Sequence, residues 1–200
     1  FRLISRATYE RLPACCEPEM QRMPLAHVTL MLKALNLGDA HIFLGGAPDP
    51  PSPVAVQAAL KALQQMKAID ANENITCLGM KLVKLPVDPR MGFALIAACL
   101  LGLGEPMAVL CALSAGQSMY QNEHHRAKEF SERRSGASLV CSDHCDGLVQ
   151  WYRLRALPPH QAEGICRREQ IEWKVIHRVT DAVDQTLNIL RSMGFGETAV

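Results

Sequence analysis

Apolar residues recur at helical spacing along most of the chain, which predicts a mainly α fold. The clearest example is residues 54–66, where Ser52 suits the N-cap and Pro53 the first helical position. Four apolar residues share one face of this helix: Val56, Ala59, Leu60 and Leu63. The same periodicity predicts helices at residues 24–35, 76–84, 90–102, 106–115, 122–133, 142–157, 161–168 and 172–193.

Other segments are shorter or differently patterned. Residues 1–5 predict a strand, and residues 41–44 a short helical turn. Ile69 and Ile75 flank a polar turn at residues 70–74 and predict a small β-hairpin. We expect Gly38 to end the helix predicted at residues 24–35. Helix, helix, hairpin and helix in this order resemble a winged-helix module, and the all-helical remainder predicts a helical bundle.

Composition restricts the class of protein. Hydrophobic residues make up 48% and charged residues 20%, which is typical of a globular protein and excludes a disordered one. The formal net charge is +1, so a uniformly basic coat for nucleic acid is excluded, although a local basic groove is not. The most apolar run, residues 93–104, is shorter than the about 20 residues of a membrane span. We therefore interpret it as a buried helix and expect no membrane contact.

The eight cysteines do not suggest a secreted disulfide scaffold. Cys99 and Cys111 lie in apolar helical runs, where a free thiol behaves as a small hydrophobic group. We expect mostly free thiols and a reducing intracellular compartment, without distinguishing nucleus, cytoplasm and mitochondrial matrix. The chain starts at Phe1 rather than Met, and we interpret it as a fragment of a larger multidomain protein.

Residues 141–145 read CSDHC and place three soft or imidazole ligands close together. A structural zinc site needs four ligands, usually as two spaced pairs, and no second pair follows. We favour a capped helix start, with Ser142 at the N-cap and Asp143 in the first turn. A cysteine–histidine catalytic pair has no support beyond chance. Neither a phosphate loop nor a dinucleotide-binding glycine motif is present, so we expect no catalytic, cofactor-binding or metal site.

Basic residues gather in two regions. Arg126 and Lys128 alternate with glutamates, whereas Arg153 and Arg155 are less compensated. A solvated helix face and phosphate contact with a nucleic acid both explain such clusters. Three aromatic residues nearby could stack on bases, although such residues are more often core: Trp151, Tyr152 and Trp173.

Several segments, in order, resemble the C-terminal part of DEAH/RHA-type ATP-dependent RNA helicases. Residues 18–25, PEMQRMPL, resemble the pattern P-E-I/M-x-R-T-P-L, with Met23 in place of threonine. Residues 47–51, APDPP, resemble A-x-D/E-P-P, and residues 78–90 resemble L-G-x-x-L-A-x-L-P-V/I-D/E-P-R. Residues 142–144, SDH, match the S-D-H that opens the long helix of the family's ratchet domain, and residues 194–195, GF, match the G-F that closes this domain. The turn at residues 70–74 is most similar to the RNA helicase A branch.

This resemblance implies a domain plan. Residues 1–21 would end the second RecA-like domain, residues 22–89 would form the winged helix, and residues 90–200 the helical ratchet (helicase-associated) domain. The module would close the RNA channel and contact single-stranded RNA during ATP-driven 3′ to 5′ translocation. ATP and Mg would be bound by upstream RecA-like domains, and an OB-like domain would follow. Further partners would be subunits of a ribonucleoprotein complex.

The resemblance and the charge pattern together nominate five RNA-binding candidates: His144, Arg153, Arg155, Arg126 and Lys128. A structural alternative remains for His144, which could instead pack on a neighbouring helix. A second hypothesis is a helicase-like scaffold of a ribonucleoprotein assembly without motor activity, motivated by Met23 and by Phe93 at a position where lysine is common. A DNA-binding regulator is disfavoured, because residues 54–66 carry only one basic residue, Lys61.

Overall fold

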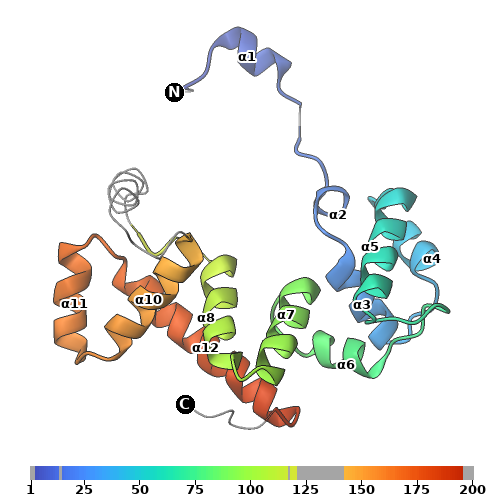
Figure 1. The fold of residues 1–200 in the computed structure, drawn as a ribbon. Helices are drawn as coiled ribbons and strands as arrows, with labels where there is room; N and C mark the ends of the chain where they lie inside the picture. Colours follow the sequence, from blue (N-terminus) through green and yellow to red (C-terminus); the bar gives the residue numbers. More distant parts are fainter. Residues whose placement is uncertain (1–2, 14, 117, 121–141, 196–200) are drawn as a thin grey trace. The chain divides into compact units, whose positions relative to one another are not determined.

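The computed structural model describes residues 3–13, 15–116, 118–120 and 142–195 (Figure 1). The fold is mainly helical, as predicted. Contacts divide the chain into two compact units, Phe1–Val83 and Lys84–Val200. The division lies between residues 83 and 84, six residues before the domain boundary at residues 89 and 90 that the sequence suggested. The assignment of the units to a winged helix and a ratchet domain stays a prediction.

The first unit consists of short helices joined by tight turns. They are α1 (Arg6–Arg11), α2 (Glu19–Arg22), α3 (Ala26–Ala34), α4 (Ala40–Gly45), α5 (Pro53–Gln65) and α6 (Cys77–Val83). The predicted strand at residues 1–5 is wrong for its described part. Leu3 and Ile4 form a bend, and Ser5 caps α1 by accepting a hydrogen bond from the Thr8 N–H at 3.1 Å.

Helix α3 packs against both α5 and α6 and forms the core of the first unit. The predicted apolar face of α5 is the buried one, and its Leu60 and Leu63 are almost wholly removed from solvent. Leu30 of α3 and Leu82 of α6 are buried in the same unit. The hydrophobic periodicity therefore identified the buried face of α5 correctly.

Two of these helices end in the same left-handed turn. After α5, Lys67 has φ 58°, and the N–H of Ala68 donates to the Leu63 carbonyl at 2.9 Å. After α3, Asn36 has φ 54°, and the Leu37 N–H donates to the Leu32 carbonyl at 3.2 Å. The stop of α3 is therefore Asn36 rather than the expected Gly38. Asparagine tolerates this conformation because its short polar side chain can bond locally.

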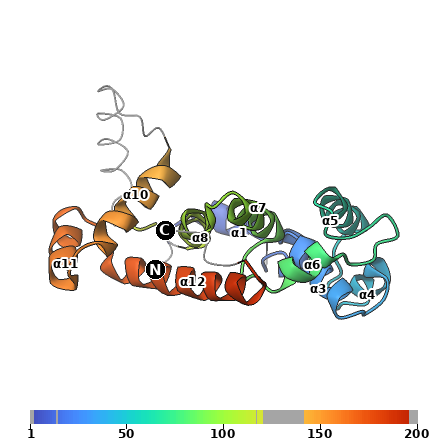
Figure 2. The same ribbon diagram turned by 60° about the horizontal axis from the view of Figure 1, so that its bottom comes forward.

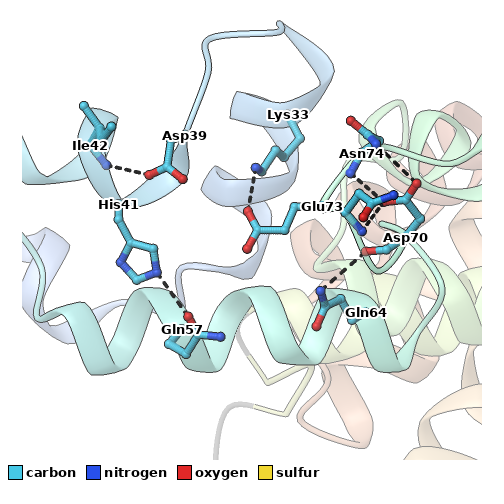
Figure 3. Close-up of polar contacts among 10 residues, drawn as sticks. Lys33, Asp39, His41, Ile42, Gln57, Gln64, Asp70, Glu73 and Asn74 are labelled. Carbon is cyan, nitrogen blue, oxygen red and sulfur yellow. Dashed lines mark hydrogen bonds and ion pairs between the residues drawn. The ribbon is translucent and has the colours of Figure 1, made fainter.

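The predicted hairpin is reduced to one antiparallel bridge between Ile69 and Ile75. Asp70 organises the turn, since its Oδ1 accepts hydrogen bonds from the N–H groups of Asn72 and Asn74, each at 2.8 Å (Figure 3). These bonds, that of Asn74 first, lower the pKa of Asp70. Glu73 adopts φ 62° and accepts a bond from Lys33 Nζ of α3 at 2.8 Å, so the turn is tied to the helical core.

The second unit is a bundle arranged around α8. Its helices are α7 (Pro89–Leu100), α8 (Gly104–Ala115), α10 (Asp143–Arg155), α11 (Pro159–Arg168) and α12 (Trp173–Ser192). Helix α8 packs against α7, α10 and α12, and Figure 2 shows the long α12 running beneath it. The predicted helix at residues 122–133 lies outside the described residues. No helix among those described is both long and apolar enough for a membrane span.

Gly79 of α6 allows an unusually close approach of two segments. A Cβ at this position would collide with the Ala68 carbonyl oxygen and lie 2.7 Å from Ile75 Cγ1. The Ala68 carbonyl cannot easily retreat, because it accepts bonds from the Thr76 N–H and the Thr76 hydroxyl, both at 3.0 Å. The absence of a side chain therefore sets the packing of α6 against the hairpin.

We predict that Gly79→Ala lowers the free energy of unfolding of the chain by about 1–3 kcal/mol, the usual cost of overpacking. Gly164→Ala is the matched control, because Gly164 is exposed on helix α11 and a Cβ added there would meet no atom within 4 Å. That substitution should raise stability by up to about 1 kcal/mol through helix propensity. Urea unfolding monitored by circular dichroism measures both, and equal effects in the two variants would contradict the steric argument.

Candidate nucleic-acid interface

Helix α10 carries three of the five predicted RNA-binding residues. Ser142 is its N-cap residue by backbone conformation, although its side chain makes no capping hydrogen bond. Gln150, Trp151 and Leu154 face the bundle interior and are buried. Cys145, Val149 and Tyr152 form the opposite, exposed face, which we call the α10 outer face.

Arg153 and Arg155 lie on the two sides of the α10 outer face. Residues two positions apart in an α-helix are separated by about 200° around the axis. One arginine therefore turns toward α11 and the other toward α8, and both side chains are partly exposed. Both arginines occupy the last turn of α10, where a positive charge is favourable. The outer face thus has a cation at each edge.

Arg153 is held by Glu169, the C-cap residue of α11. Its two terminal nitrogens donate to the two carboxylate oxygens, at 3.1 and 3.0 Å. Arg153 Nη1 also donates to the Oε1 of Gln150 at 3.3 Å. The side chains of Arg153 and Glu169 remain 45% and 31% exposed, so water screens the pair.

Arg155 is held differently. Its Nη1 donates one hydrogen bond to Glu105 Oε1 at 3.3 Å, and its guanidinium carbon lies 4.8 Å from the centre of the Trp151 ring. The indole Nε1 of Trp151 donates to the hydroxyl of Thr180 on α12 at 3.2 Å. Through Trp151, Arg155 and Glu105, this end of α10 is attached to both α12 and α8.

Tyr152 is the aromatic residue that the outer face offers to a ligand. It is 37% exposed, whereas Trp151 is fully buried, with its ring edge-on to Tyr152 at 5.0 Å. Burial, and then the charge of Glu105, raise the pKa of the Tyr152 hydroxyl, so the group stays neutral at physiological pH. Trp173, the third aromatic candidate, is half-buried and packs edge-on against His177 at 4.5 Å.

The remaining candidates stand apart or lie outside the described residues. His144 is exposed in the first turn of α10, on the side of Arg155 but about 16 Å away along the helix axis. Its exposure gives no support to the alternative in which it packs against a neighbouring helix. Arg126 and Lys128 fall within residues 121–141, which the structure does not describe.

Glu105 and Glu169 are site residues that the sequence analysis missed. Glu105 is 50 positions from its partner Arg155, and Glu169 is 16 positions from Arg153. No periodic pattern connects residues at such separations on different helices. Only the helix packing brings these charges together.

Chemistry by thiols or metals has little support. Among the described residues, no three metal-ligating side chains gather at one point. A hollow of about 320 Å³ between α8 and α12 is lined partly by Cys111 and by small residues such as Ala112 and Ala182. Burial raises the pKa of the Cys111 thiol, as it does for Cys99 and Cys166, and a protonated thiol is a poor nucleophile and ligand.

Comparison with known proteins agrees with this architecture. Residues 59–87 match the family described as "Helicase associated domain (HA2), winged-helix". ATP-dependent RNA helicase DHX29 of Homo sapiens is 27% identical over 99% of this chain and 15% of its own length. DExH-box ATP-dependent RNA helicase DExH3 of Arabidopsis thaliana is 37% identical over 96% of this chain and 16% of its own length.

The chain is related to the DEAH/DExH-box ATP-dependent RNA helicases along nearly its whole length. A further relative is the pre-mRNA-splicing factor ATP-dependent RNA helicase prp22 of Schizosaccharomyces pombe, 28% identical over 95% of this chain and 16% of its own length. The chain thus spans only about a sixth of the helicases it resembles. The family resemblance is confirmed, while the assignment to the RNA helicase A branch stays a prediction.

The charge of Glu105 should be measurable at Tyr152. We predict that Glu105→Gln lowers the pKa of the Tyr152 hydroxyl, because it removes a negative charge that disfavours tyrosinate. Nuclear magnetic resonance titration of the labelled tyrosine ring measures this pKa. Glu163→Gln removes a charge from α11, where Glu163 pairs with Arg167, and should leave the pKa unchanged. An unshifted pKa in Glu105→Gln would contradict the effect of the Glu105 charge on Tyr152.

Proposed function

We propose that this chain is the winged-helix and ratchet portion of an ATP-dependent RNA helicase, and that its α10 outer face contacts single-stranded RNA. The relation to RNA helicases over nearly the whole chain carries the proposal. In it the full protein hydrolyses ATP, translocates 3′ to 5′ and uses this portion to close the RNA channel. A reducing intracellular compartment fits the unbonded state of the described cysteines.

The chemistry of the α10 outer face supports contact with a single strand. Arg153 and Arg155 offer guanidinium groups to phosphates on either side of Tyr152, whose ring can stack on a base. Phosphate contacts and stacking carry no base sequence information. Binding should therefore tolerate different sequences and weaken as salt increases.

ATP and Mg belong, in this proposal, to RecA-like domains outside these 200 residues, and an OB-like domain completes the channel. The sequence supports this division because it contains no phosphate loop. The alternative is a helicase-like scaffold protein without motor activity. The motor and the scaffold would be distinguished by the ATPase motifs of the full-length protein. A phosphate-loop lysine and a D-E-x-H motif in its peptides support the motor, and their absence supports the scaffold.

The RNA contact predicts a change in salt dependence. Arg153→Ala combined with Arg155→Ala should weaken binding of single-stranded RNA and reduce the slope of log affinity against log salt by about 1.4, for two lost contacts. Fluorescence anisotropy with a labelled homopolymer RNA at several salt concentrations measures the slope, and circular dichroism monitors folding.

A matched control removes the same charge elsewhere. Arg90 in α7 and Arg191 in α12 are exposed, and their joint substitution by alanine should leave the slope nearly unchanged. An unaltered slope in the Arg153 and Arg155 variant would contradict the proposed contact. Equal losses in both pairs would indicate a general effect of net charge.

His144 provides a separate test. Because its side chain is exposed, His144→Gln should leave the thermal midpoint of unfolding nearly unchanged. We also propose that His144, which is exposed on the Arg155 side of α10, contacts RNA, so His144→Gln should lower the affinity for single-stranded RNA severalfold. Anisotropy and thermal unfolding on the same sample decide the role, and lost stability with intact affinity would point to a structural residue instead.

A further inference from the structure

The carboxylate of Glu169 occupies the very groups with which Arg153 would meet a phosphate. The pair is bidentate, at 3.0 and 3.1 Å, and engages both terminal nitrogens of the guanidinium. A carboxylate and a phosphate present similar pairs of oxygens to this fork of donors. The two acceptors therefore compete for the same edge of Arg153.

The position of Glu169 is fixed by the turn between α11 and α12. The Ile171 N–H donates to the Cys166 carbonyl at 2.8 Å, and Gln170 between them adopts φ 54°. This bond and the left-handed Gln170 end helix α11, and the two residues that the bond joins, Ile171 and Cys166, are both buried. The Glu172 N–H then donates to the Met119 carbonyl at 2.7 Å. The backbone of Glu169 is thus fixed next to Arg153, while its side chain is exposed enough to adopt another rotamer.

We propose that the Arg153–Glu169 pair is an autoinhibitory latch, which single-stranded RNA opens by exchanging a phosphate for the carboxylate. This inference rests on the proposed RNA contact of α10. An exposed ion pair contributes little stability, so RNA can displace it. While the pair is closed, Glu169 engages the two terminal nitrogens of Arg153, so only the open fraction of molecules offers this edge to a phosphate, which lowers the apparent affinity.

Arg155 makes a useful contrast. It gives Glu105 one hydrogen bond at 3.3 Å, and its guanidinium stacks on Trp151. One bond to a carboxylate uses only one of the five N–H donors of a guanidinium, so a phosphate can approach Arg155 without first removing Glu105. The latch is assigned to Arg153 alone, since there one carboxylate takes both terminal nitrogens of the guanidinium.

The test is a double-mutant cycle in the 200-residue chain, with a labelled single-stranded homopolymer RNA as the probe. Its members are Glu169→Gln, Arg153→Ala and the two together. We expect Glu169→Gln to raise affinity about two- to fivefold at low salt, the range that corresponds to an exposed pair. In the Arg153→Ala background, the same substitution should give no gain.

A control separates release of the arginine from the loss of one negative charge. Asp181 is exposed on α12 and takes no part in either arginine pair, so Asp181→Asn should leave the affinity unchanged. A gain that persists in the Arg153→Ala background would mean simple repulsion between Glu169 and phosphate, and would overturn the latch. A loss or no change in folded Glu169→Gln would overturn it as well, leaving the pair a structural tie.

A second measurement does not depend on the folding of any variant. On addition of the RNA to the unsubstituted chain, the guanidinium resonances of Arg153 and the carboxylate resonance of Glu169 should shift together. A shift of Arg153 without one at Glu169 would overturn the exchange. If the unsubstituted chain binds no RNA, the proposed function fails and the latch fails with it, whereas RNA binding without the exchange overturns the latch alone.

Discussion

Burial of Trp151 determines what helix α10 shows to its surroundings. The indole ring is completely removed from solvent, and its N–H bonds to Thr180 of α12. These two conditions fix the rotation of α10 about its axis, because an aromatic side chain of this size finds few places in a packed interior. Once the rotation is set, Tyr152 must face outward, and the two arginines must fall on the two edges of that face.

Each of the two arginines lies next to a glutamate of a neighbouring helix or turn. Glu105 lies in the first turn of α8, where the helix N-terminus favours a negative charge, and Glu169 is the C-cap residue of α11. The outer face of α10 consequently carries less free positive charge than its sequence suggests. In the proposed contact, a phosphate has to displace Glu169 at Arg153 but not Glu105 at Arg155, so recognition depends on geometry as well as on net charge.

The sequence predicted the helices well and the details of the site poorly, for a physical reason. Helical periodicity is local, so the apolar face of α5 and the hairpin residues Ile69 and Ile75 were identified from residues a few positions apart. The pairing of Arg155 with Glu105 is set by three-dimensional packing over 50 positions, and nothing in either neighbourhood reveals it. The helix ends were predicted less accurately than the helices. The sequence predicted that Gly38 ends α3, whereas Asn36 adopts the left-handed conformation that ends it.

The close contact at Gly79 has a consequence for related proteins. The Ala68 carbonyl occupies the space that a side chain would need, so the approach of α6 to the hairpin is possible for glycine alone. In any related helicase that carries a larger residue at the equivalent position, α6 must sit further from the hairpin. That single position therefore tells whether the geometry of this corner can be transferred to a relative, whatever the overall identity between the two sequences.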